Sequence, residues 1–171
     1  MTDQIKSSEE RKHFPRMSLC NASAAKKAGR RLSLLYDTLL APTGLKITQY
    51  GILSELRSRG AALPTVGELA EQLVMDRSTL GQNLRPLERE ELVTLLTDPK
   101  DRRSRLIALT QHGLAKLEEA ARCWKMAQDR FETTVGKQEA AALRSALHAI
   151  AYNENLSKRS SREGTKRRKG F

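Results

Sequence analysis

The sequence predicts a mainly α-helical fold with one small antiparallel β-hairpin. From residue 19 to residue 155, apolar residues recur at the spacing of amphipathic helices. Two short apolar runs, 92–96 and 105–109, have the length of strands and flank a turn rich in lysine and arginine. The 171 residues are 39% hydrophobic, which suffices for a core in a single domain.

The composition favours an anionic partner and a reducing compartment. The formal net charge of +11 would draw the chain to phosphate backbones or to anionic membranes. No run approaches the roughly 18 consecutive apolar residues of a spanning helix, and the polar N-terminus lacks the apolar stretch of a signal peptide. We therefore expect a cytoplasmic protein without a membrane partner, in which Cys20 and Cys123 are free thiols.

The first third of the chain predicts a polar arm followed by two helices. Residues 1–17 are charged and polar, which predicts a flexible arm. Apolar residues at helical spacing then predict a helix over 19–40 with basic residues on its other side. A turn at 41–44 separates it from a second helix over 47–59, which Gly60 ends.

Two short helices joined by a tight turn should follow. Thr65 and Glu68 have the spacing of a capping box, so a helix should begin at Thr65 and end near Met75. Asp76 can cap the next helix, which should run to Glu90. Together with the hairpin, this order predicts a winged helix-turn-helix.

Three residues in or just after the second of these helices do not suit a regular helix. Gly81 costs about 1 kcal/mol relative to alanine, Pro86 removes an amide hydrogen bond, and Glu91 stands where a helix-ending glycine is common. We expect the C-terminal half of the helix to bend or fray, while the N-terminal half keeps its exposed polar face.

The last third predicts a long helix, a shorter helix and a basic tail. Thr110 should cap a helix to Val135, and the last helix should span 138–155. We expect these helices to bury Leu114, Leu117, Ala121, Trp124, Phe131, Val135, Leu143, Leu147, Ile150 and Tyr152. Residues 157–171 hold seven basic residues and one acid, which predicts a disordered tail.

Three segments and the order of the elements connect the chain to a known family. The segments are LAPTGLKITQYGIL (40–53), TVGELAEQLVMDRSTL (65–80) and DPKDRRSRLIALTQHG (98–113). Over residues 20–155 the chain resembles the MarR family of bacterial transcriptional regulators. The resemblance implies a homodimer that binds double-stranded DNA without a cofactor, close to the nucleoid. It also implies a helical dimerisation region over 18–44 and 110–156, and a DNA-binding lobe over 45–109.

The resemblance assigns a role to the turn of the hairpin, the wing. The D-x-R motif of the family falls on Asp101 and Arg103, which implies that Arg103 enters a minor groove while Asp101 steadies it. A narrow minor groove concentrates negative potential and suits a guanidinium. Lys100 and Arg102 should then contact the DNA backbone. The alternative is that these charges only solvate a hairpin turn.

The helix that begins after Asp76 is the expected recognition helix. Its side chains Ser78, Thr79, Gln82 and Asn83 can each donate and accept hydrogen bonds in a major groove. Arg77 can reach a guanine edge or a phosphate. The alternative is that these residues are ordinary polar surface positions.

The resemblance also implies a switch, of which two kinds are open. The first is a small aromatic or phenolic effector in a crevice between the dimer helices and the DNA-binding lobe. Residues that could line such a crevice are Arg30, Tyr36, Tyr50 and Trp124, although a stripe of this kind is more often core.

The second kind of switch is thiol oxidation. Cys20 opens the first helix near two lysines, where cations and a helix N-terminus favour the thiolate. In the family's organic-hydroperoxide sensors a tyrosine follows one turn later, whereas here that position is Ala24 and only Tyr36 remains. Cys123 could approach Cys20 across a domain-swapped dimer, and inert thiols are the alternative.

Enzymatic and metal-binding functions find no support in the sequence. It has no nucleophile elbow, P-loop or converging carboxylates, and no metal-ligand spacing around His13, His112 or His148. The primary hypothesis is a dimeric repressor on a pseudo-palindromic operator, released by an effector or by oxidation. The alternatives are an architectural protein that binds nucleic acid nonspecifically through the tail, and a winged helix that binds a protein.

Overall fold

The computed structural model describes residues 17–157, so nearly all of the expected arm and tail lies outside the described residues. In chain order, the elements are η2 (Met17–Leu19), α1 (Asn21–Leu40), η3 (Ala41–Thr43), α2 (Ile47–Arg59), α3 (Val66–Gln72), α4 (Arg77–Arg89), β1 (Val93–Thr97), β2 (Arg105–Leu109), α5 (Gln111–Val135), α6 (Lys137–Ala151) and α7 (Glu154–Ser157). This confirms the mainly helical fold with one antiparallel hairpin. Within the described part, no helix combines the length and apolar character needed to cross a bilayer.

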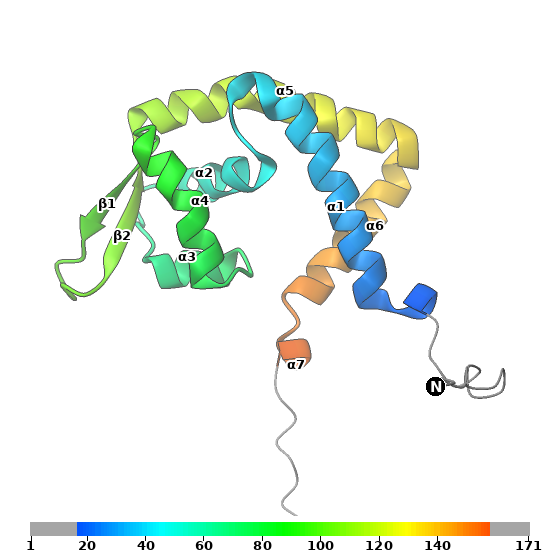
Figure 1. Cartoon of the computed structure of the whole chain (residues 1–171), viewed down its shortest axis with the longest axis horizontal. Coiled ribbons are helices and arrows are strands. Elements are labelled where there is room, and N and C mark those ends of the chain that lie inside the picture. Colours follow the sequence, from blue (N-terminus) through cyan, green and yellow to red (C-terminus); the bar gives the residue numbers. More distant parts are fainter. Residues whose placement is uncertain (1–16, 158–171) are drawn as a thin grey trace, which may run out of the picture.

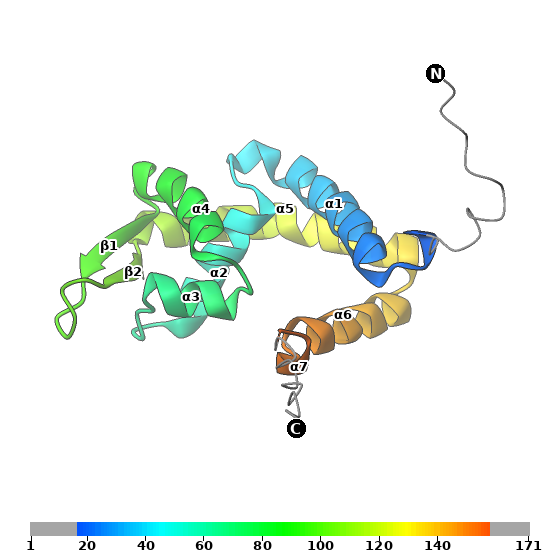
Figure 2. The ribbon, with the colours of Figure 1, turned by 60° about the horizontal axis from the view of Figure 1, so that its bottom comes forward.

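The long helix α5 connects two groups of elements (Figure 1). At one end lies the winged lobe, which consists of α2, α3, α4 and the hairpin. Nearer the other end, α1 crosses α5 and packs against it, and α6 folds back from the end of α5 (Figure 2). The start of α4 and the tip of the hairpin both lie at the lower edge of the winged lobe in Figure 1, away from α5.

The helix-turn-helix forms through caps that the sequence predicted. Thr65 Oγ1 accepts from Glu68 N at 3.1 Å, and Glu68 Oε2 accepts from Thr65 N at 2.7 Å. The helix α3 ends at Gln72, earlier than expected, because Val74 adopts a left-handed conformation with φ of 51°. Met75 N then bonds back to Ala70 O at 2.8 Å, which satisfies a terminal carbonyl and makes the turn tight.

The expected fraying of α4 does not occur. The helix continues through Gly81 and Pro86 to Arg89, because Leu84 and Leu87 are buried in the core and hold its second half. Glu91 takes the left-handed position usually given to glycine, with φ of 56°, and Leu92 N bonds to Leu87 O.

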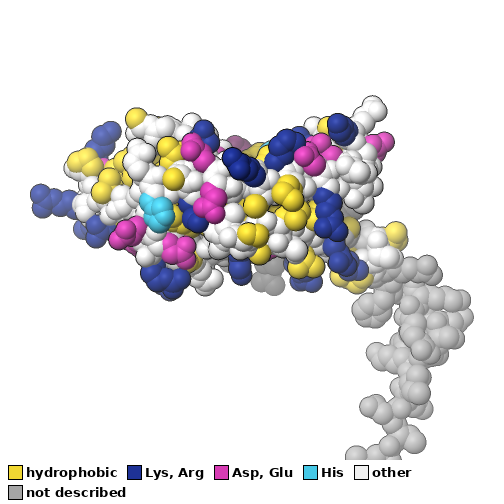
Figure 3. All heavy atoms as spheres, turned by 90° about the horizontal axis from the view of Figure 1, so that it is seen from above, with side chains coloured by type: hydrophobic (Ala, Val, Ile, Leu, Met, Phe, Trp, Pro, Cys, Tyr) yellow, Lys and Arg dark blue, Asp and Glu magenta, His cyan; other side chains and the backbone are white. Residues whose placement is uncertain are grey.

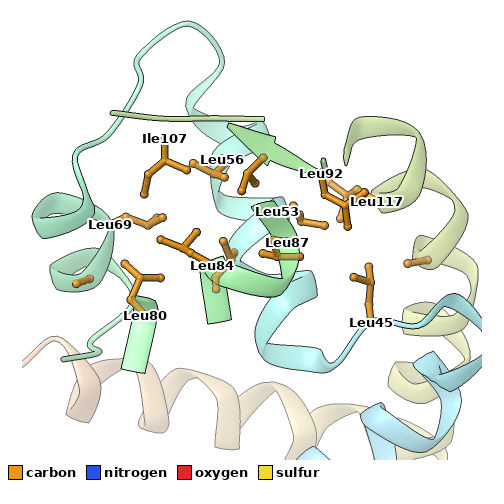
Figure 4. Close-up of a cluster of buried hydrophobic side chains, with 14 of the residues drawn as sticks. Leu45, Leu53, Leu56, Leu69, Leu80, Leu84, Leu87, Leu92, Ile107 and Leu117 are labelled. Atoms are coloured by element: carbon orange, nitrogen blue, oxygen red, sulfur yellow. The ribbon is translucent and has the colours of Figure 1, made fainter. Parts of the chain in front are cut away.

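A leucine-rich core fixes α4 and the hairpin to the rest of the lobe (Figure 4). The strand β1 starts one residue later than predicted and pairs with β2 in a register that places Leu95 opposite Ile107. Ile107 N also donates to Pro64 O at 2.9 Å, so the segment before α3 joins the hairpin. Fully buried side chains in this core include Leu53, Leu69, Leu80, Leu87, Leu92 and Ile107.

The burial expected for α5 and α6 was partly wrong. The buried residues of α5 are Gly113, Leu117, Ala120 and Ala127, whereas Val135 is exposed. The last helix ends at Ala151, and its apolar side chains are 40–59% exposed at Leu143, Leu147 and Ile150, with Tyr152 beyond it also exposed. The reason is that α6 packs mainly against α5 in a single chain, which leaves most of its surface uncovered.

We predict opposite effects for two glycine-to-alanine substitutions. A Cβ at Gly113, in the first turn of α5, would overlap the carbonyl oxygen of Leu92. Gly113→Ala should therefore lower the free energy of unfolding by about 1–3 kcal/mol. Gly51→Ala, inside α2 with no atom within 4 Å of the added Cβ, should raise it by about 0.5–1 kcal/mol. Urea unfolding of both variants checks this, and equal effects would contradict the close helix–strand contact.

Candidate nucleic-acid interface

The tip of the hairpin is held by carboxylates that bind its own backbone. Asp98 Oδ1 accepts from Lys100 N at 2.8 Å, and Asp101 Oδ1 accepts from Arg103 N at 3.0 Å. Asp101 O also accepts from Ser104 N at 2.9 Å. These short-range bonds fold the tip into one shape without using the basic side chains.

The basic side chains of the tip remain available to a partner. Lys100, Arg102 and Arg103 are exposed, and no carboxylate within residues 17–157 forms an ion pair with them. Figure 3 shows lysine and arginine side chains gathered at the end of the molecule where the hairpin lies. Asp101 therefore orders the backbone of Arg103 and leaves the guanidinium of Arg103 exposed.

The start of α4 is organised by one carboxylate. Asp76 Oδ1 accepts from Thr79 N at 2.7 Å and from Ser78 Oγ at 2.5 Å, while Asp76 Oδ2 accepts from Thr79 Oγ1 at 2.7 Å. Hydrogen bonds from the side chain of Ser78, then from the side chain and backbone of Thr79, hold the pKa of Asp76 well below its usual range. Asp76 therefore stays ionised at neutral pH.

This network corrects one expectation for the recognition helix. While the hydroxyl hydrogens of Ser78 and Thr79 are bound to Asp76, neither side chain can donate a hydrogen bond to DNA. Each hydroxyl can then only accept one. Asn83 is also partly committed, because its Nδ2 donates to Thr79 O at 2.9 Å. Among the described residues the amide of Gln82 has no partner, and this side chain is exposed.

Arg77 lies between the two helices of the helix-turn-helix. Its Nη2 atom is 3.0 Å from the place where a Cβ at Gly67 would be, so the exposed guanidinium rests on the first turn of α3. The absence of a side chain at Gly67 makes room for it. From this place Arg77 can contact a phosphate beside the helix or a base edge.

The residues expected to bind an effector are only partly brought together. Tyr36 and Trp124 line a pocket of about 330 Å³ between α1, α5 and α6, and Tyr50 stacks on Trp124 from outside it, with ring centroids 6.0 Å apart. Arg30 is not part of this pocket and lies with other basic residues on the outer side of α1.

Sequence reasoning missed two polar residues of this pocket. Tyr36 Oη donates to Gln128 Oε1 at 2.5 Å, and Arg144 Nη2 lies 3.3 Å from Glu132 Oε1. Burial raises the pKa of Tyr36, with Arg144 lowering it and Glu132 raising it. The spacing of Trp124 and Gln128, one helical turn apart, was a signal for the first residue, whereas no local signal placed Arg144 there.

The two cysteines are free and half-buried. Cys20 precedes the first turn of α1 and shares a shallow depression with Lys26 and Lys27, as the sequence suggested. Cys123 lies on α5 and packs against the core. Their role as a redox pair remains a prediction.

The helix-turn-helix, the hairpin and the polar first turn of α4 together define a winged helix-turn-helix. Residues 43–104 match the model of the MarR family. The repressor NicR of Pseudomonas putida is 30% identical over 98 residues, which cover 57% of this chain and 61% of NicR. The activatory protein BadR of Rhodopseudomonas palustris is 37% identical over 71 residues, or 41% of each chain. The chain thus matches less than two thirds of the length of these curated relatives.

Solved structures extend the similarity to almost the whole described chain. The transcriptional regulator MosR of M. tuberculosis in complex with DNA has a TM-score of 0.72 and 28% identity, covering 82% of this chain and 99% of MosR. A second MosR structure is 30% identical, with a TM-score of 0.64, and covers 78% of this chain and 98% of MosR. The chain belongs to the MarR family of transcriptional regulators.

The carboxylate at the start of α4 predicts a pH dependence of stability. Because the folded-state pKa of Asp76 is depressed from its ordinary 3.8, its ionised form stabilises the fold above that value, and this contribution is lost as the pH falls through the folded-state pKa. Asp76→Asn keeps a capping oxygen but cannot titrate.

Urea unfolding between about pH 5 and pH 2 should therefore show the wild type losing stability relative to Asp76→Asn as the pH falls. A constant difference between the two proteins over that range would contradict the role of the carboxylate.

Proposed function

We propose that the protein is a sequence-specific DNA-binding transcriptional regulator that acts as a homodimer. The observation that carries the proposal is the common edge shared by the start of α4 and the tip of the hairpin (Figure 1). The groups there that have no hydrogen-bond or ion-pair partner among residues 17–157 are the side chains of Arg77, Gln82, Lys100, Arg102 and Arg103. A helix start with polar side chains suits a major groove, and a basic hairpin tip suits the adjacent minor groove.

The dimer is proposed from apolar side chains that a single chain leaves uncovered. Leu34 on α1 is 58% exposed, and Leu143, Leu147 and Ile150 on α6 are 40–59% exposed. Exposed apolar patches on helices outside a core commonly mark a protein interface. We assign 18–44 and 110–156 to dimerisation and 45–109 to DNA binding. A two-fold axis would then place the two α4 helices about one helical turn of DNA, about 10 base pairs, apart.

We further propose that the protein represses transcription by occluding a promoter. NicR is named a repressor and BadR an activatory protein, so relatives of both kinds exist. A small aromatic or phenolic effector would occupy the pocket at Tyr36 and Trp124, whose polar side is formed by Gln128 and Arg144. If the dimer has two conformations that differ in the spacing of the α4 helices, the effector can shift their populations only by binding one conformation more tightly than the other.

Removing the guanidinium of Arg103 tests the DNA-binding role. Arg103→Ala should weaken binding to the promoter DNA beside the protein's own gene by about 1–3 kcal/mol, since one groove contact is lost. The matched control is Arg122→Ala, which removes an exposed arginine of α5 and lowers the net charge equally, outside the lobe 45–109 that we assign to DNA binding.

Fluorescence anisotropy on promoter and random DNA measures both variants. If both variants lose the same amount of DNA affinity, the effect of Arg103→Ala comes from the lower net charge alone. Equal wild-type affinity for the two DNAs would favour the architectural alternative, and no DNA binding would favour a protein partner. For the basic tail, deletion of 157–171 should weaken binding to both DNAs by a similar factor.

Thiol oxidation is the alternative switch, and Cys20 is its test. If Cys20 is the sensor, mild peroxide should release the wild type from promoter DNA and leave Cys20→Ser bound. Release of the Cys20→Ser protein would remove Cys20 from the mechanism. A wild type that is unaffected by peroxide would leave the effector pocket as the switch.

A further inference from the structure

The hydroxyl of Thr79 is fixed in one hydrogen-bonding sense. Thr79 lies in the first turn of α4, at the edge proposed to face DNA, and its Oγ1 is 2.7 Å from Asp76 Oδ2. An ionised carboxylate only accepts hydrogen bonds, so the single hydrogen of this hydroxyl must point to Asp76. The low pKa of Asp76 keeps the carboxylate ionised at every pH at which DNA binding would be measured.

A hydroxyl whose single hydrogen is already donated can only accept hydrogen bonds from a ligand. Phosphate oxygens are acceptors, as are the N7 and O6 atoms of guanine and the O4 atom of thymine. The only donors on the floor of the major groove are the amino groups at N6 of adenine and N4 of cytosine. Of the groups on the floor of the major groove, only these two amino groups can therefore donate a hydrogen bond to Thr79.

We infer that Asp76 makes Thr79 a reader of base amino groups, so that the operator carries adenine or cytosine where Thr79 meets it. This inference rests on the proposed sequence-specific DNA binding and deepens it. Asp76 acts here as a positioning residue, because it touches Thr79 and not the base. Thr79 is assigned to base readout and not to the phosphate contacts that many first-turn hydroxyls make.

Because Asp76 has two carboxylate oxygens, a substitution there can turn the Thr79 hydroxyl from an acceptor toward DNA into a donor without removing the helix cap. Oδ1 receives two donors, Thr79 N and Ser78 Oγ, whereas Oδ2 receives only Thr79 Oγ1. In Asp76→Asn the remaining oxygen should take the Oδ1 place, and the amide nitrogen should take the Oδ2 place and donate to Thr79 Oγ1. The Thr79 hydroxyl must then point its hydrogen outward, while Ser78 keeps its bond and the helix keeps its cap.

The test is selection of preferred sites from a randomised DNA library by four full-length proteins: wild type, Asp76→Asn, Thr79→Val and the double variant. The wild type should select adenine or cytosine at one position of each half-site. Asp76→Asn should shift that position toward guanine or thymine, changing the relative preference by about 2- to 13-fold, as expected for one hydrogen bond. Thr79→Val keeps the shape but lacks the hydroxyl, so it should lose the preference there, and Asp76→Asn should have no further effect in its background.

A second measurement uses a modified operator. Replacing a selected adenine by unsubstituted purine removes only the amino group. Where cytosine is selected, replacing it by 2-pyrimidinone does the same. Wild-type affinity should fall, and Thr79→Val should bind both DNAs equally.

Each other outcome overturns the inference. If Thr79→Val weakens binding to all sequences alike, Thr79 contacts the backbone. If Asp76→Asn leaves the preference of the wild type unchanged, Asp76 does not set the sense of the hydroxyl. If the wild type selects no sequence at all, the proposed function itself fails, which the other two results would leave intact.

Discussion

The burial of three leucines on one side of α4 decides which side chains of this helix face the solvent. Leu80, Leu84 and Leu87 are at most 3% exposed, and burying each side chain is worth about 1.5–3 kcal/mol. With that side fixed in the core, the polar residues at the start of α4 must face outward. The hairpin is tied to the same core through Ile107, so the recognition helix and the wing are held by one set of contacts.

Four acidic residues of the lobe order its backbone, and within residues 17–157 none of the four forms an ion pair with a basic side chain. Glu68, Asp76, Asp98 and Asp101 each accept a backbone N–H within three residues. Such short-range bonds shape the turns on which the basic residues stand. Because these carboxylates face the backbone, they do not neutralise the guanidinium of Arg103 beside them. A carboxylate near a proposed DNA surface is therefore compatible with binding a polyanion.

The helical part of the molecule has the opposite character. Its packing in one chain is incomplete, since α6 exposes apolar residues and α1 exposes Leu34. Four polar side chains at the pocket between these helices are linked: Tyr36 donates to Gln128, Gln128 Nε2 donates to Glu132 Oε1, and Arg144 also meets Glu132. The pocket lies between α1, α5 and α6, and α5 follows directly on strand β2 of the winged lobe.

The sequence by itself determined what depends on residues close together in the chain. The caps at Thr65, Asp76 and Thr110 were predictable because each joins groups three positions apart, and the two strands because each is a short apolar run beside the turn. Only the tertiary structure decided which side of α6 is covered and which residues share the pocket of Tyr36. Both depend on packing between helices that are distant in sequence, which the spacing of residues within one helix does not specify.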